Sequence, residues 1–142
     1  MNSTALVVDA SVAVKWLFDE PDSGLAKSLQ DRRLLAPDLL LLECCSVIWR
    51  NVASGRLRPS WVPEALAILR TAPVQLTGVE LLLDDILRYA TLLGHPVYDC
   101  AYLALAVLND LRVVTADRRF VRAVRTDGIL ARHIVLLGDL AH

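Results

Sequence analysis

The stretch ALVVD at residues 5–9 is an apolar run of strand length that ends in an acid, and a segment of helical periodicity begins near Ser11. Short apolar runs are typical of buried strands, whereas apolar residues three or four apart are typical of helices. This alternation continues to the end of the chain. Because strands that alternate with helices form parallel sheets covered on both faces, we expect a three-layer α/β/α fold around a mainly parallel sheet of about five strands.

The expected order of elements is β-α-α-β-α-α-β-α-α-β-α-β. Strands are expected near residues 5–9, 34–36, 74–77, 112–115 and 133–137. Helices are expected to begin near Ser11, Ser23, Asp38, Pro59, Glu80, Asp99 and Arg118, where capping residues or prolines precede apolar periodicity. The 142 residues contain no linker rich in Pro, Gly or Ser, so we expect a single domain over residues 1–142.

The composition excludes some classes of protein. Hydrophobic residues make up 55% of the chain, but no uninterrupted apolar run approaches the roughly 20 residues that span a bilayer. The first residues have no basic region, and the apolar run after them reaches Asp9 too early for a signal peptide, so we expect a cytoplasmic protein. Three cysteines, Cys44, Cys45 and Cys100, have no ligand-like spacing. We interpret them as small, reduced core residues, and a zinc site that also uses His95 is disfavoured.

Four acids occupy positions where a parallel sheet would bring them together: Asp9, Glu43, Asp99 and Asp117. Asp9 and Asp117 end predicted strands, and ligands of open α/β sheets bind at the carboxyl ends of strands. Taken singly, the three aspartates could be helix caps, and Glu43 could form a buried ion pair with an arginine. Taken together they would repel one another without a cation, and carboxylate oxygens suit Mg²⁺ or Mn²⁺.

The four acids lie in segments that resemble the signature segments of PIN domains, and most closely those of VapC-type ribonuclease toxins of toxin-antitoxin pairs. These segments are residues 7–12 (VVDASV), 36–43 (APDLLLLE), 98–106 (YDCAYLALA) and 114–120 (VTADRRF). They stand in the family's order and at family-like spacing, from the first predicted strand to the last. The resemblance implies a PIN-like domain.

The resemblance also implies an activity and a set of partners. It places the metal-binding and catalytic acids on Asp9, Glu43, Asp99 and Asp117, with Ser11 and Thr115 beside them. The implied reaction is hydrolysis of RNA phosphodiester bonds by an endoribonuclease that uses Mg²⁺ or Mn²⁺. The implied partners are RNA, a cognate antitoxin protein and a second copy of the chain in a homodimer. Which group acts as general base is left open.

Arginines are the candidates for binding RNA. Only two of the 15 basic residues are lysines, and arginine is better suited to bidentate phosphate contacts. The candidates are Arg50, Arg118, Arg119 and Arg122, although a solvated charged face would explain many of them equally well. Candidates for an antitoxin groove are Trp16, Leu17, Phe18, Trp49 and Trp61, each of which could instead belong to the core.

Other classes fit the sequence less well. A receiver domain needs a lysine after its last strand, and a haloacid-dehalogenase-like phosphatase needs a second acid where Ser11 stands. Neither GxxxxGK[ST] nor GxGxxG occurs, which disfavours a nucleotide-binding module. The remaining alternative is a catalytically silent PIN-like binding or regulatory module.

Overall fold

The computed structural model describes residues 5–140, and its centre is one parallel sheet. The strand order is β3-β2-β1-β4-β5, and all four neighbouring pairs are parallel. The strands are β1 (Leu6–Val8), β2 (Leu34–Pro37), β3 (Val74–Thr77), β4 (Val113–Thr115) and β5 (Ile134–Leu136). The expected parallel sheet of five strands is therefore confirmed, and with the helices on its two faces so is the expected three-layer α/β/α fold.

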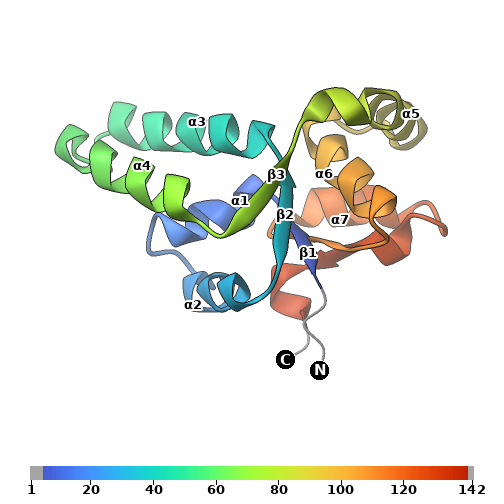
Figure 1. Ribbon diagram of the computed structural model, residues 1–142, viewed down its shortest axis with the longest axis horizontal. Helices are drawn as coiled ribbons and strands as arrows, with labels where there is room; N and C mark the ends of the chain where they lie inside the picture. Colours follow the sequence, from blue (N-terminus) through green and yellow to red (C-terminus); the bar gives the residue numbers. More distant parts are fainter. Residues whose placement is uncertain (1–4, 141–142) are drawn as a thin grey trace.

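Helices cover both faces of the sheet (Figure 1). One face carries α1 (Ala10–Ala13), α2 (Ser23–Ser28), α3 (Leu39–Ala53) and α4 (Val62–Thr71), and the other carries α5 (Leu83–Leu93), α6 (Val97–Leu108) and α7 (Arg118–Arg125). Short 3₁₀ segments cover Val14–Trp16, Leu29–Asp31, Pro59–Trp61, Val79–Leu82, Ala131–His133 and Leu137–Asp139. The two layers follow from right-handed crossovers, because the chain steps outward from β1 to β3 and then back across to β4 and β5.

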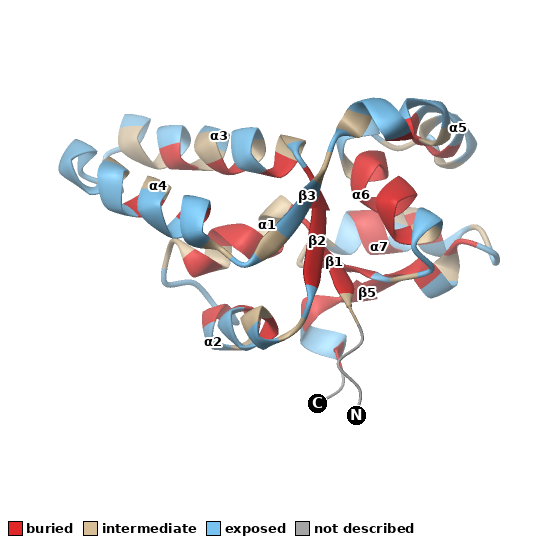
Figure 2. Cartoon of the chain, in the orientation of Figure 1, coloured by how far each residue is buried: buried red, intermediate tan, exposed pale blue. Residues whose placement is uncertain are grey.

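The core lies around the central strands and α6 (Figure 2). Strands β1, β2, β4 and β5 are buried along their whole length, whereas the edge strand β3 is partly exposed. Helix α6 is buried continuously from Cys100 to Ala106 and packs against β1, β2, β4 and α5. A helix that is apolar on all sides is expected to be buried. This packing holds one end of α6, with Asp99, beside the central strands.

One sequence prediction about local structure is wrong, and for Trp16 the structure decides between two open interpretations. Helix α6 begins at Val97 instead of Asp99, because Pro96 is extended (φ −56°, ψ 143°) and takes the N-cap position. A proline favours the start of a helix, since the helix's first N–H groups need no intrahelical partner. Trp16 is only 5% exposed, and its indole N–H donates to the Ala26 carbonyl at 2.8 Å. Trp16 is therefore a core residue and does not line a groove.

The cysteines are placed as expected, with Cys44 and Cys100 buried, Cys45 half-buried and all three thiols free. Within residues 5–140 no single helix is long and apolar enough to cross a membrane, and only the bent pair 79–93 and 97–108 passes by length and composition. The expectation of one domain over residues 1–142 includes residues 1–4 and 141–142, which lie outside the described residues, and stays a prediction.

Candidate metal centre

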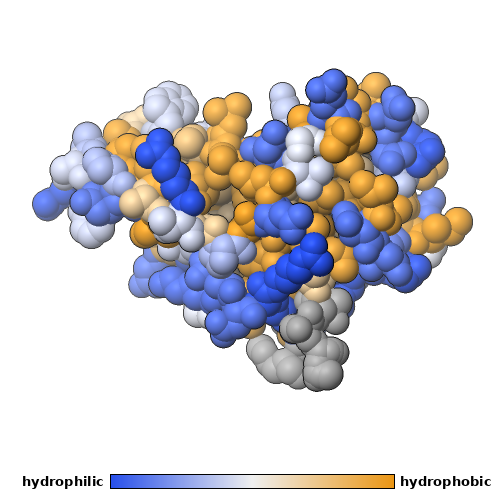
Figure 3. All heavy atoms as spheres, in the orientation of Figure 1, coloured by the Kyte–Doolittle hydropathy of each residue, from blue (hydrophilic) through white to orange (hydrophobic). Residues whose placement is uncertain are grey.

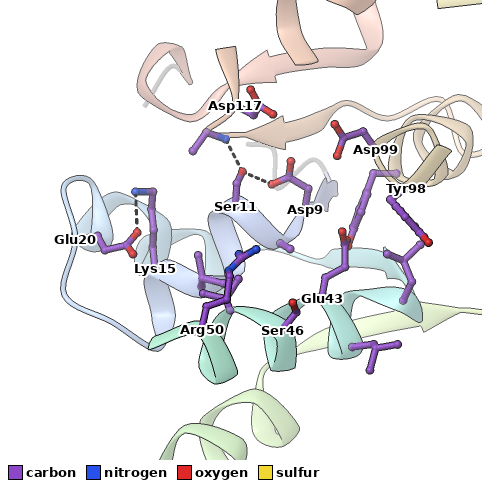
Figure 4. Close-up of a pocket in the computed structure, with 17 residues that line it drawn as sticks. Asp9, Ser11, Lys15, Glu20, Glu43, Ser46, Arg50, Tyr98, Asp99 and Asp117 are labelled. Atoms are coloured by element: carbon purple, nitrogen blue, oxygen red, sulfur yellow. Dashed lines mark hydrogen bonds and ion pairs between the residues drawn. The ribbon is translucent and has the colours of Figure 1, made fainter. Parts of the chain in front are cut away.

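The four predicted acids line one cavity at the carboxyl edge of the sheet. The chain leaves β1 toward the helices of one face and leaves β4 toward α7 on the other, so a crevice opens between these neighbouring strands. A cavity of about 780 Å³ lies there and includes Asp9, Glu43, Asp99 and Asp117 in its lining. Figure 4 shows their side chains reaching toward the same space from four different elements.

Asp9 is the most buried of the four acids. It follows β1 and is the N-cap of α1, with an exposed fraction of 4%. Its Oδ1 accepts hydrogen bonds from the Ser11 hydroxyl at 2.6 Å and from the Val12 N–H at 3.2 Å. The pKa of Asp9 is raised to about 7, chiefly by burial and also by the charge of Asp99, against the opposing effect of the hydrogen bonds from hydroxyls and backbone. Asp9 is thus a cap, as one interpretation predicted, and also a carboxylate that is costly to ionise without a cation.

Two hydroxyls tie the strand ends together beside Asp9. Ser11 Oγ lies 3.2 Å from Thr115 Oγ1 and accepts the Ala116 N–H at 2.8 Å. Thr115 Oγ1 accepts the Asp117 N–H at 3.1 Å. The start of α1 is therefore joined to the end of β4, and both hydroxyls lie next to predicted ligands.

Asp117 is held by backbone alone. It is the N-cap of α7, and its Oδ1 accepts the Arg119 N–H at 2.9 Å. The capping interpretation is therefore correct for its local structure. The carboxylate also lines the cavity, so capping and a role at the metal are compatible.

Glu43 is held by a tyrosine. It lies on α3 and is half-buried, and the Tyr102 hydroxyl of α6 donates a short hydrogen bond to its Oε1. Burial raises the pKa of Glu43, and the charge of Asp99 adds to this, although the hydrogen bond from Tyr102 opposes it. The alternative interpretation, an ion pair with an arginine, is not found, because no arginine among the described residues forms a salt bridge with Glu43.

Asp99 is held by a histidine. Its Oδ2 lies 2.7 Å from Nε2 of His95, which stands four residues earlier in the turn before α6. The predicted cap at Asp99 is wrong, since Pro96 is the N-cap and Asp99 lies within the first turn of α6. The charge of Asp99 raises the pKa values of both Asp9 and Glu43, so these three acids lie within electrostatic reach of one another.

The donor set fits a hard divalent cation by its chemistry. It consists of carboxylate oxygens, and in a buried site a cation would offset the cost of ionising Asp9. Across residues 5–140, however, no group of three or more His, Cys, Asp or Glu side chains lies close enough to hold a metal ion. The four acids share a cavity without forming a closed ligand shell, and their assignment as ligands stays a prediction. The same finding gives no support to the disfavoured zinc site.

Basic side chains lie in and around the cavity. Arg50 of α3 lines it, and so does Lys15, whose Nζ lies 3.4 Å from Glu20 Oε1 and donates to the Pro21 carbonyl at 2.8 Å. Arg118, Arg119 and Arg122 are solvent-accessible on α7, the helix that Asp117 caps. All four arginines predicted to bind RNA are thus solvent-accessible. Their exposure is consistent with RNA binding and equally with a solvated charged face.

The sequence reasoning missed the partners of the two helical acids. His95 and Asp99 are four residues apart, and this spacing was a usable signal of their contact. The pairing of Tyr102 with Glu43 spans 59 residues and had no local signal. Tyr98 and Ser46 also line the cavity and were not predicted as site residues.

Comparison with known proteins gives a family and a fold. Residues 6–125 match the family model described as PIN domain. The structure is similar to the crystal structure of PAE2754 from Pyrobaculum aerophilum, with a TM-score of 0.65 and 19% sequence identity. The similarity covers 96% of this chain and 91% of that chain, and at this identity it supports the fold alone. No curated protein matches the chain.

Proposed function

This chain belongs to the PIN domain family, and from that premise we propose that it is a metal-dependent endoribonuclease, the toxin of a toxin-antitoxin pair. PIN domains are generally nucleases that need a divalent metal ion. RNA as the substrate and the toxin role rest on the resemblance of the four signature segments to those of VapC-type toxins.

The observation that carries the proposal is the convergence of Asp9, Glu43, Asp99 and Asp117 on one cavity at the switch point of the sheet. The pKa values of Asp9 and Glu43 are both raised, chiefly by burial. Neither acid forms a salt bridge with a basic side chain of residues 5–140. Buried acids without a cationic partner destabilise a fold, so their retention in one cavity favours an external cation.

In the proposed site the four acids would hold one or two Mg²⁺ or Mn²⁺ ions. Such an ion supplies a Lewis acid that lowers the pKa of water and offsets negative charge on the phosphate during hydrolysis. Hydrogen bonds within the chain orient the acids: Ser11 and the Val12 N–H orient Asp9, and Tyr102 orients Glu43. Solvent-accessible Arg118, Arg119 and Arg122 and the cavity residue Arg50 would bind RNA phosphates without reading bases.

The proposed protein partners are a cognate antitoxin and a second copy of the chain, and the proposed location is the cytoplasm. Large apolar side chains are exposed on several helices, among them Leu42 and Trp49 on α3, Trp61 just before α4, and Leu87 and Leu92 on α5. Figure 3 shows apolar residues reaching the surface between hydrophilic ones on the face it presents. Such exposure supports protein interfaces.

The test is cleavage of purified total RNA by the wild-type protein with Mg²⁺, with Mn²⁺ and with a chelator, beside an Asp9→Asn variant. The proposal expects cutting that needs the metal and that falls by at least about 100-fold in the variant. Cutting that survives the chelator, or that Asp9→Asn leaves unchanged, would contradict it.

One observation favours the alternative of a catalytically silent PIN-like module, namely that no three acids of the described chain are gathered closely enough to hold an ion. Calorimetry separates the two functions. A silent module is expected to show neither RNA cleavage nor heat of Mn²⁺ binding, whereas the nuclease is expected to show both.

A further inference from the structure

His95 is built into the turn between α5 and α6 and points at a predicted metal ligand. Gly94 before it has the left-handed conformation (φ 61°), and Pro96 after it is extended. The His95 N–H donates to the Ala90 carbonyl at 3.2 Å, which closes the turn. The imidazole Nε2 lies 2.7 Å from Asp99 Oδ2, and the His95 side chain is only 12% exposed.

The other side of this contact is a buried aromatic ring. His95 stacks on Phe120 with 5.2 Å between ring centroids and 8° between planes. Phe120 is fully buried on α7, three residues after Asp117 caps that helix. The imidazole therefore lies between two of the elements that carry predicted ligands, and stacking restricts the directions in which its nitrogens can point.

The chemistry of the pair sets the direction of the hydrogen bond. An ionised carboxylate can only accept, so Nε2 carries the proton and donates to Asp99 Oδ2. This bond occupies one carboxylate oxygen and limits rotation of the group, which leaves Oδ1 for a ligand in the cavity that Asp99 lines. Residues that hydrogen-bond to a ligating carboxylate orient it at the metal, and their loss typically lowers metal affinity by about 10- to 100-fold.

We propose that His95 is a positioning residue for the metal centre, which orients Asp99 through Nε2 and is itself fixed by Phe120. This inference rests on the proposed function. It assigns a role to a histidine that lies outside the four signature segments and does not itself line the cavity. It also predicts that the hydrogen-bonding nitrogen matters at the metal and that the aromatic ring matters for packing.

Two substitutions separate these roles. His95→Phe keeps an aromatic ring against Phe120 and removes the N–H, whereas His95→Gln removes the ring and can place an amide N–H near the position of Nε2. By calorimetry with Mn²⁺, we expect the dissociation constant to rise by about 10- to 100-fold in His95→Phe. In His95→Gln we expect it to stay close to wild type, with a lower melting temperature. RNA cleavage should also be weaker in His95→Phe than in His95→Gln, and the difference should lie in kcat.

A matched control is His133→Phe. His133 is also buried and hydrogen-bonded, with Nδ1 2.8 Å from the Leu111 carbonyl, but it lies at the amino edge of the sheet, opposite the cavity. We expect this variant to be less stable and to keep its affinity for Mn²⁺. Circular dichroism establishes that each variant is folded before it is titrated.

The outcomes distinguish this inference from the proposed function. If folded His95→Phe binds Mn²⁺ as wild type does, while Asp9→Asn does not, His95 has no positioning role and the nuclease proposal stands. Equal decreases in affinity in His95→Phe and His95→Gln would also overturn the inference, because the ring and not the nitrogen would then matter. A wild-type protein that binds no Mn²⁺ would overturn both proposals.

Discussion

The acids after strands and the acids on helices are held in different ways. Asp9 and Asp117 follow β1 and β4, and each accepts a backbone N–H at the start of a helix. Glu43 and Asp99 lie within α3 and α6, and the hydrogen bonds that hold them come from the side chains of Tyr102 and His95. Asp117 is held by a backbone donor and Asp9 by a backbone donor together with the Ser11 hydroxyl, whereas each helical acid is held by one aromatic side chain.

This difference has a consequence for mutation. Backbone donors cannot be removed by changing a side chain, so Asp117 should tolerate changes in its neighbours, and Asp9 should keep one donor when Ser11 is changed. The helical acids should be sensitive to single substitutions that leave the fold intact. Burial does not follow this division between strand-end and helical acids. Asp9, a strand-end acid, is the most buried of the four and the most costly to ionise.

The largest expected effect concerns Asp9. Its pKa is raised from 3.8 to about 7, so in the absence of metal it contributes stability that is fully present below about pH 4 and disappears as the pH rises through 7. The free energy of unfolding should fall by up to about 4 kcal/mol over this range. Denaturant unfolding with a chelator at pH 5 and pH 8 should show about 3 kcal/mol of this decrease.

Asp9→Asn should remove most of this pH dependence and make the metal-free protein more stable at pH 8. The control is Asp19→Asn, which changes an exposed acid. Equal pH dependence in Asp9→Asn and wild type would show that Asp9 is ionised in the folded protein without a cation.

The next effect concerns Glu43. Tyr102→Phe removes its hydroxyl donor and keeps the buried ring, so kcat/KM for RNA cleavage should fall by about 10- to 100-fold with little change in melting temperature. The matched control is Tyr98→Phe, on the same helix and in the same cavity but exposed. Indistinguishable kinetics in the two variants would break the contrast between helical and strand-end acids.

A smaller decrease in kcat/KM is expected for Ser11→Ala, about 10-fold or less, because the Val12 N–H still holds Asp9 Oδ1. Ser46→Ala, a serine of the same cavity on α3, serves as the control and should cleave like wild type. A decrease in Ser11→Ala as large as in Tyr102→Phe would contradict the view that backbone donors suffice for the strand-end acids.

The smallest effect concerns the arginines of α7. An Arg118→Ala, Arg119→Ala double variant should weaken RNA binding at low salt and reduce the slope of log affinity against log salt by about 1 for each phosphate that the arginines no longer neutralise. Fluorescence anisotropy over a salt series measures this slope. The control is Arg33→Ala, Arg132→Ala, at the amino edge of the sheet, and an equal change in slope there would refute the assignment.

Much of the fold was predictable because its signals are local. The apolar runs that end at Asp9 and near Asp117 predicted buried strands, and the helical periodicity predicted the crossovers. The strand order was not predictable from the runs themselves, yet it is what makes β1 and β4 neighbours and brings Asp9 near Asp117. Asp99 was predicted to cap a helix, but Pro96, three residues earlier, is the N-cap of α6.

The candidate site was predictable in its acids and less so in their partners. Trp16 and Val12 have helical spacing, which fits a core helix equally well, and only the structure shows Trp16 buried. The contact of Glu43 with Tyr102 depends on how α3 and α6 approach each other from opposite layers, and no local pattern encodes that approach. His95 had a local signal in its spacing from Asp99, but the sequence reasoning weighed it only as a zinc ligand.

We propose that these acids hold a divalent cation in this cavity. The most direct measurement is diffraction from crystals grown with Mn²⁺, with anomalous data collected to locate the ion. We expect an anomalous peak in the cavity, with an Asp9 oxygen at roughly 2.1 Å and at least one helical acid, Glu43 or Asp99, among the ligands. Crystals that hold Mn²⁺ elsewhere, or that show no peak beside Asp9, would contradict it.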